Sequence, residues 1–338
     1  MRTIWNALLL TLAVLGATAQ ATEYGVRQTV HLGGEGGWDY LSYDPATQRL
    51  FISRGTHVQV VDPDSGTVVG DIPDTPGVHG IAIATGLDKA YTSNGRDNSL
   101  TVFAPSTLKV LGRIATPDGV GPDFIAFDPT TRQVLAFNGK SHSATFVDTA
   151  TDRVAHTLPL AGKPEAAVSD GKGRMFVEIE DKNLLQVIDT DRAAVQANWP
   201  LPGCDEPAGL AIDREERRLF VACHNKTLLV LDAGDGRVVG HVAIGAGVDA
   251  AGFDAGRRLV FSAQGDGSLS VIQGDKGAGY RVVQTVTTRP GARTLAVDEQ
   301  RHRVFLVTAD FEPQPEGKSG RRVMKPDSFT LLVVNSAP

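Results

Sequence analysis

The sequence predicts an all-β fold, a seven-bladed β-propeller whose blades are four-stranded antiparallel sheets. Three observations lead to this prediction: a repeat of 40 to 44 residues, short apolar segments of strand length within each repeat, and 37 glycines and 18 prolines that suit many tight turns. A helical solenoid would show a 3.6-residue period, which this sequence lacks, and the rungs of a parallel β-helix are shorter.

Each repeat except the last contains four strand-like segments. In the stretches that begin at Tyr40, Phe124 and Gly209, an apolar strand ends in Asp, a polar turn follows, and a second strand ends in small or polar residues. A third strand with Val-Asp or Leu-Asp and a fourth strand complete the unit. The residue that closes the first strand recurs at gaps of 40, 44, 42, 43, 41 and 44, at Asp44, Ala84, Asp128, Asp170, Asp213, Asp254 and Asp298. Seven such units fit a propeller, whose blades cannot bury their faces alone.

The two ends of the chain are predicted to share one blade. The last unit has only three strand segments, within "RTLAVDEQ", "RVFLVTAD" and "SFTLLVVN". The segment "YGVRQTVHLGG", residues 24–34, resembles the fourth strands of other units, such as "VVGDI". Pairing the two ends closes the ring and removes the sheet edges that an open array would expose.

The N-terminus predicts export. A basic start, an apolar run from Ile4 to Leu15 and the sequence Ala19-Gln20-Ala21 are typical of a cleavable signal peptide over residues 1–21. A retained anchor is the alternative, but the run is too short for a lasting membrane span. We therefore expect a single propeller domain over residues 22–338, without stable membrane insertion and located in the periplasm.

Charge narrows the classes of partner. The formal net charge is −6, which disfavours nucleic acid, because proteins that bind it carry a basic stripe. The partners expected instead are a small polar ligand or an envelope protein. The pattern requires no assembly larger than a monomer.

Several segments resemble a known family. "AYTSNGRDNSLTVFAPSTLKVLGRI" is similar to the Tyr-Val-Thr-Asn (YVTN) repeat, and "GGWDYLSYDP", "DTPGVHGIAIA" and "GVDAAGFDAG" extend the similarity along the chain. The whole chain after residue 21 resembles YncE-like seven-bladed propellers of bacteria. This resemblance implies an exported propeller without a defined biochemical role, and it brings no catalytic residues.

The two cysteines are predicted to form a disulfide. Cys204 falls in the loop that leads into the fifth unit, and Cys223 ends the second strand of that unit, so both should lie on one face at adjacent strand ends. An oxidising compartment favours the bond. A zinc site would need more ligands than the nearby His224 adds, and a Cys223–His224 dyad is disfavoured because neighbouring residues of a strand point to opposite faces.

The candidate binding residues share one position in the repeat. We call the recurring residue that closes the first strand the marker of each repeat. Five residues before it, the first strand is expected to begin at one end of the central channel, the channel mouth. These seven positions hold Asp39, His79, Asp123, Glu165, Ala208, Asp249 and Arg293. Glu206 lies two residues before Ala208. Converging carboxylates repel one another unless a cation compensates, so we expect a ligand at the mouth. A divalent cation is one candidate, with Asp39, His79, Asp123, Glu165 and Asp249 as its candidate ligands. An amine-bearing ligand is another, and Arg293 would orient any anionic group.

The alternative to a ligand site is ordinary polar structure, since propeller channels are commonly filled with water. Trp38, beside Asp39, would stack on a ligand or pack within the blade. Further loop residues are expected on the same face: Arg54, His57, Asn94, Arg96, Asn138, His142, Lys182, Asn183, His224 and Asn225. The asparagines among them are typical of turns.

Blade seven carries an insertion at residues 312–327. It contains a basic cluster, Lys318, Arg321, Arg322 and Lys325, and would act as a lid or a docking site, or simply as a loop. The function predicted from these observations is ligand or partner binding at the channel mouth without turnover. The alternatives are a metal-assisted lyase or lactonase with His79 as general base, and an envelope scaffold that binds through the insertion.

Overall fold

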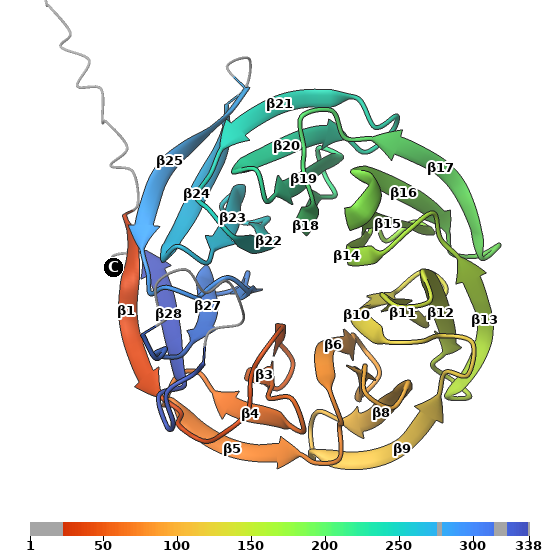
Figure 1. Ribbon diagram of the computed structural model, residues 1–338, viewed down its shortest axis with the longest axis horizontal. Helices are drawn as coiled ribbons and strands as arrows, with labels where there is room; N and C mark the ends of the chain where they lie inside the picture. The colour runs from red at the N-terminus through yellow and green to blue at the C-terminus, as the bar shows by residue number, and fades with distance from the viewer. Residues whose placement is uncertain (1–22, 276–278, 314–322, 337–338) are drawn as a thin grey trace, which may run out of the picture.

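The computed structural model describes residues 23–275, 279–313 and 323–336, and it forms a ring of seven four-stranded antiparallel sheets (Figure 1). This confirms the predicted seven-bladed β-propeller. The expected signal peptide, residues 1–21, lies outside the described residues. The part of the chain that is described holds no helix with the length and hydrophobicity of a membrane span.

The blades follow one another along the chain, and each runs from an inner first strand to an outer fourth strand. Blade one contains β2 (Leu41–Asp44), β3 (Arg49–Ser53), β4 (Val58–Asp62) and β5 (Thr67–Ile72). Blade two contains β6 (Val78–Ala84), β7 (Lys89–Asn94), β8 (Ser99–Ala104) and β9 (Lys109–Ala115). Blade three contains β10 (Pro122–Asp128), β11 (Gln133–Asn138), β12 (Ser143–Asp148) and β13 (Arg153–Pro159).

Blade four contains β14 (Pro164–Ser169), β15 (Arg174–Ile179), the 3₁₀ turn η1 (Glu180–Lys182), β16 (Leu184–Asp189) and β17 (Ala194–Pro200). Blade five contains β18 (Pro207–Asp213), β19 (Arg218–Cys223), β20 (Thr227–Asp232) and β21 (Val238–Ala243). Blade six contains β22 (Val248–Asp254), β23 (Leu259–Gln264), β24 (Ser268–Asp275) and β25 (Gly279–Thr287). Blade seven contains β26 (Leu295–Asp298), β27 (Arg303–Thr308), β28 (Thr330–Ser336) and β1 (Tyr24–His31).

The recurring aspartate caps the turn between the first and second strands. The Asp44 carboxylate, for example, accepts hydrogen bonds from the backbone N–H groups of Ala46 and Thr47, at 3.1 and 3.3 Å. Just before the second strand the backbone turns left-handed, with φ between 54° and 57° at Gln48, Arg132, Arg217, Arg258 and His302. An aspartate side chain that satisfies turn amides favours such hairpins, which explains why this residue marks the repeat.

The core consists of apolar clusters that span neighbouring blades, such as the one shared by blades two and three. The third residue of each second strand is at most 1% exposed: Phe51, Tyr91, Leu135, Phe176, Phe220, Phe261 and Phe305. Burial of each such side chain contributes about 1.5–3 kcal/mol, so these positions hold adjacent blades together. The fourth strands, by contrast, are largely exposed at the outside of the ring, as in β9.

The ring closes where β1 pairs with β28 in an antiparallel register that runs from Tyr24 opposite Ser336 to His31 opposite Thr330. Figure 1 shows β1 as the outer strand of the last blade. Gln284 of β25 reinforces the closure, because its amide side chain accepts a hydrogen bond from the Tyr24 N–H (2.9 Å) and donates one to the Tyr24 carbonyl (2.7 Å). The predicted sharing of one blade by both chain ends is confirmed.

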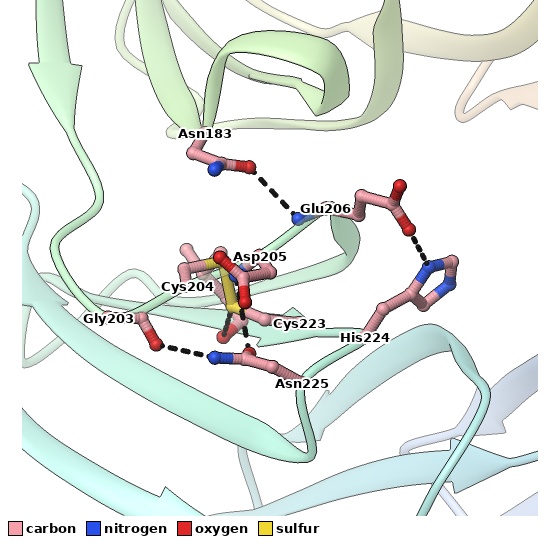
Figure 2. Close-up of a disulfide and its surroundings, with 9 residues drawn as sticks. Asn183, Gly203, Cys204, Asp205, Glu206, Cys223, His224 and Asn225 are labelled. Atoms are coloured by element: carbon pink, nitrogen blue, oxygen red, sulfur yellow. Dashed lines mark hydrogen bonds and ion pairs between the residues drawn. A yellow bond between two sulfur atoms is a disulfide. The ribbon is translucent and has the colours of Figure 1, made fainter.

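Cys204 and Cys223 form the predicted disulfide, with an S–S distance of 2.05 Å and a Cα–Cα distance of 5.4 Å (Figure 2). The bond ties the loop that leads into blade five to the end of β19, and both cysteines are buried. Asn225 adds a second tie, because its amide donates to the Gly203 carbonyl at 2.9 Å. The disulfide is thus a structural bond between two adjacent strand ends.

Replacing both cysteines by serine should lower the free energy of unfolding by about 3 kcal/mol, because the unfolded chain regains the freedom of a loop with a sequence separation of 19. Urea unfolding of C204S/C223S against the parent protein measures the loss. The parent protein under reducing conditions serves as the control and should show a similar loss. Equal stability of the double variant and the parent would contradict this role of the bond.

Candidate functional site

The predicted binding residues lie where the innermost strands begin, around the central axis of the ring (Figure 1). In blades two to six the second residue of the first strand occupies this position, and the strand register shifts there in each case. Such β-bulges re-aim a side chain out of the regular pleat. The bulges therefore explain how His79, Asp123, Glu165 and Asp249 are presented at the mouth of the channel instead of within the blade interfaces.

Asp39, His79 and Asp123, from three consecutive blades, form one cluster. The imidazole Nδ1 of His79 lies 2.6 Å from Asp39 Oδ2 and 3.4 Å from Asp123 Oδ1. One oxygen or nitrogen from each residue can be chosen so that all three atoms lie within 4.8 Å of one another. All three side chains remain partly accessible to solvent, so a dissolved ion can reach them.

Burial and the neighbouring carboxylates have opposite effects on the pKa of His79. Burial by itself lowers the pKa of His79, but the hydrogen bond with Asp39 and the negative charge of Asp123 outweigh it and raise that pKa. Burial raises the pKa of Asp123, with His79 acting in the opposite direction. The two carboxylates therefore favour the protonated form of His79, whose Nδ1 lies between them, the place that a metal ion would take.

Glu165 lies beside this cluster and is the most enclosed of the predicted carboxylates. The Tyr40 hydroxyl donates a hydrogen bond of 2.9 Å to Glu165 Oε1, and Lys163 Nζ lies 3.4 Å from Oε2. Burial, followed by the charge of Asp123, raises the pKa of Glu165 to about 8. Glu165 therefore carries a proton near neutral pH in the folded protein.

Asp249 is paired with Arg293 across the boundary between blades six and seven, with Arg293 Nε 2.9 Å from Asp249 Oδ2. Burial raises the pKa of Asp249 to about 7, although Arg293 acts to lower it. About half of the Arg293 side chain is exposed, whereas that of Asp249 is 15% exposed. Arg293 thus compensates one carboxylate of the mouth, while about half of its side chain stays exposed.

Glu206 does not join the inner carboxylates. Its side chain is 63% exposed and its Oε2 lies 2.9 Å from His224 Nδ1 at the rim beside the disulfide (Figure 2). Its backbone N–H donates a hydrogen bond to Asn183 Oδ1 at 2.9 Å. Blade five therefore contributes only Ala208 to the inner position, and Glu206 forms a separate pair on the rim.

Three residues of the site were not singled out from the sequence. Tyr40 and Lys163 hold Glu165, and each lies within two residues of a predicted site position. Gly95 makes room for the imidazole, because a Cβ at this position would come within 2.9 Å of His79 Nε2. The spacing to the repeat marker would have identified the first two, but only the packed structure identifies the glycine.

Several residues expected near the mouth instead form hydrogen bonds that stabilise loops and turns. Arg54 is 1% exposed, and its guanidinium donates to the carbonyls of Gly33, Glu35 and Gly36 and lies over the Phe329 ring. The buried Asn94 and Asn138 bind side chains across their own turns: Ser99 and Thr101 in one case, Ser143 and Thr145 in the other. As predicted from their residue type, the asparagines stabilise turns.

Only the two ends of the blade-seven insertion are described. Phe311 and Met324 form an isolated antiparallel bridge, and the Lys325 N–H donates to the Asp310 carbonyl at 2.7 Å. We call residues 310–313 and 323–325 the neck of the insertion. Three members of the expected basic cluster, Lys318, Arg321 and Arg322, lie outside the described residues.

Comparisons with known proteins support the fold and leave the family open. No family model matches the chain, and no curated protein matches it in sequence. Among solved structures, 1821 chains match, so the fold is too widespread to indicate one function. One of them, described as "Crystal Structure of Mitotic Checkpoint Complex", has a TM-score of 0.74 and 12% identity, over 90% of this chain and 95% of that one. At this identity the similarity shows the propeller fold alone.

The E165Q variant should become more stable relative to the parent protein as the pH rises. A carboxyl whose folded pKa exceeds its unfolded value stabilises the fold at low pH, and this contribution is lost as the pH rises from the unfolded value toward about 8. The amide keeps an acceptor for Tyr40 and carries no charge. The excess of the E165Q unfolding free energy over that of the parent should therefore be larger at pH 8 than at pH 5 by roughly 3 kcal/mol.

Urea unfolding at both pH values measures this difference. E215Q, which changes a carboxylate that is 85% exposed, is the matched control and should show no such trend. A stability difference between E165Q and the parent that stays constant with pH would show that Glu165 is ionised in the folded protein.

Proposed function

We propose that this chain is an exported binding protein and that the mouth of its channel holds a divalent cation between Asp39, His79 and Asp123. The observation that carries the proposal is the mutual proximity of their ligand atoms, all within 4.8 Å. One imidazole and two carboxylates suit ions such as Zn²⁺ or Mn²⁺ better than Ca²⁺, which takes oxygen ligands almost exclusively. A bound cation would also offset the repulsion among the enclosed carboxylates.

Export rests on two observations. Residues 1–21 have the pattern of a signal peptide, and the Cys204–Cys223 disulfide fits an oxidising compartment such as the periplasm. The resemblance to YncE-like YVTN propellers supports the same interpretation, because it implies an exported propeller. We propose on this basis that residues 22–338 form the functional domain.

We propose binding without turnover rather than the lyase or lactonase alternative. The pKa of His79 is raised, and carboxylate oxygens of Asp39 and Asp123 lie 2.6 and 3.4 Å from its Nδ1 atom. Both carboxylates favour a positive charge at this position, which either a proton on the imidazole or a bound cation supplies.

The cation site predicts that the full chain binds one Zn²⁺ in isothermal titration calorimetry at neutral pH. Removing one ligand, in H79A or D123N, should weaken Zn²⁺ binding at least tenfold. Loss of a residue that only hydrogen-bonds to a metal ligand typically weakens binding by about 10- to 100-fold, so loss of a ligand itself should cost at least as much. Bound Zn²⁺ should also raise the thermal midpoint of the parent protein, because it binds only the folded state.

H31A is the matched control. His31 and Asp327 form another His–Asp pair, 3.5 Å apart, but both side chains are more than 60% exposed. This variant should bind Zn²⁺ like the parent. If H79A and H31A bind equally, or if the parent takes up no stoichiometric Zn²⁺, Asp39, His79 and Asp123 form only a hydrogen-bonded network.

A further inference from the structure

A second cavity opens at the mouth, beside the one that holds Asp39 and His79. It measures about 350 Å³ and is lined by Trp38, Phe311, Met324, Arg293 and four glycines: Gly37, Gly247, Gly265 and Gly291. The cavity with Asp39 and His79 measures about 430 Å³ and shares Gly37 and Trp38 with it. Trp38 thus separates a polar cavity from a largely apolar one, which we call the aromatic cavity. Its volume is at the small end of ligand sites.

The wall of the aromatic cavity comes from two loops that other blades do not reproduce. Trp38 lies in the loop that leads into blade one, with its ring centroid 6.0 Å from that of Phe311 and 5.3 Å from that of Phe329. Phe311 and Met324 pair across the neck of the insertion. Trp38, Phe311 and Met324 all remain partly accessible to solvent. The neck therefore places Phe311 and Met324 near the surface, with Phe311 next to Trp38.

The floor of the cavity is bare backbone. The Gly265 N–H donates to the Gly247 carbonyl and the Gly291 N–H donates to the Gly265 carbonyl, both at 2.8 Å. Gly291 has φ +86°, and a Cβ there would lie 2.8 Å from the Phe311 ring. Glycine is therefore required at this position for the aromatic ring to reach the floor, which leaves a flat-sided space suited to a planar group.

Arg293 supplies the one charged group of this lining. Its Nε faces Asp249, which is its ion-pair partner within the described residues, and about half of its side chain is exposed. A guanidinium has five donors in one plane, so the edge that carries the Nη groups can still bind a carboxylate through two parallel hydrogen bonds.

We propose that the aromatic cavity binds a small aromatic carboxylate, with its ring against the wall formed by Trp38, Phe311 and Met324 and its carboxylate on Arg293. This goes beyond the cation site, since it names a second ligand class and a separate set of residues at the same mouth. Either site can fail without the other.

The test uses Trp38 as its own reporter. The chain has three tryptophans, Trp5, Trp38 and Trp199, so the W5F/W199F variant of the full chain retains only Trp38. Phenylacetate should quench its fluorescence saturably and bind about tenfold more tightly than the neutral 2-phenylethanol, because the carboxylate gains charge-assisted hydrogen bonds. The cationic 2-phenylethylamine should bind more weakly than either.

Three further variants, made in the W5F/W199F background, test the roles of the Arg293 charge and of the cavity wall. D249N should bind phenylacetate more tightly, because it removes a competing carboxylate from Arg293, and D249N/R293Q should lose at least tenfold relative to D249N. F311A/M324A should weaken phenylacetate and 2-phenylethanol alike. R192Q is the matched control, since Arg192 also pairs with an aspartate at 2.9 Å but in a turn between β16 and β17, and its binding should not change.

The outcome is decisive in either direction. Circular dichroism confirms that each variant is folded, and Zn²⁺ titration of the same samples reports the cation site independently. The proposal is overturned if phenylacetate does not quench Trp38, if 2-phenylethylamine binds as tightly as phenylacetate, or if binding survives in D249N/R293Q.

Discussion

The pairing of β1 with β28 is the constraint on which the rest of the structure depends. Without it blade seven would lack its outer strand, and the edge of β28 would be exposed. Closure fixes the number of blades, and with it the distance at which the inner strands face one another. It therefore forces the side chains at the start of those strands into a shared volume, although they lie about 40 residues apart in the sequence.

This convergence has an electrostatic consequence. Four carboxylates enter the mouth from blades one, three, four and six, and burial raises the pKa of three of them, Asp123, Glu165 and Asp249. The fold tolerates them because a cation stands beside each group: His79 between two aspartates, Lys163 at Glu165 and Arg293 at Asp249. In the cation site proposed above, a bound cation and a bound proton would relieve the same repulsion, and the two would therefore compete.

The sequence predicted the features that follow from the repeat. The blade count, the shared last blade and the Cys204–Cys223 bond all depend on backbone register, which the spacing of the marker residues reveals. The pairings within the mouth depend on rotamers and on the bulges of the inner strands, and a spacing does not encode these. Glu206 illustrates the limit: two residues before the repeat position, it pairs with His224 on the rim. The space that Gly95 leaves for His79 likewise becomes visible only after packing.

A ring with seven equal blades would present the same side chain seven times, and selectivity requires that this symmetry be broken. Here the differences gather where the chain ends meet. Blade seven replaces a carboxylate by Arg293 and carries the insertion whose neck places Phe311 and Met324 against Trp38 of blade one. Loop length is free to vary at this seam because the inner strands, and not the loops, hold the blades together. The mouth consequently has a polar cavity with Asp39 and His79 and a largely apolar cavity with one guanidinium, and both cavities are lined by Trp38.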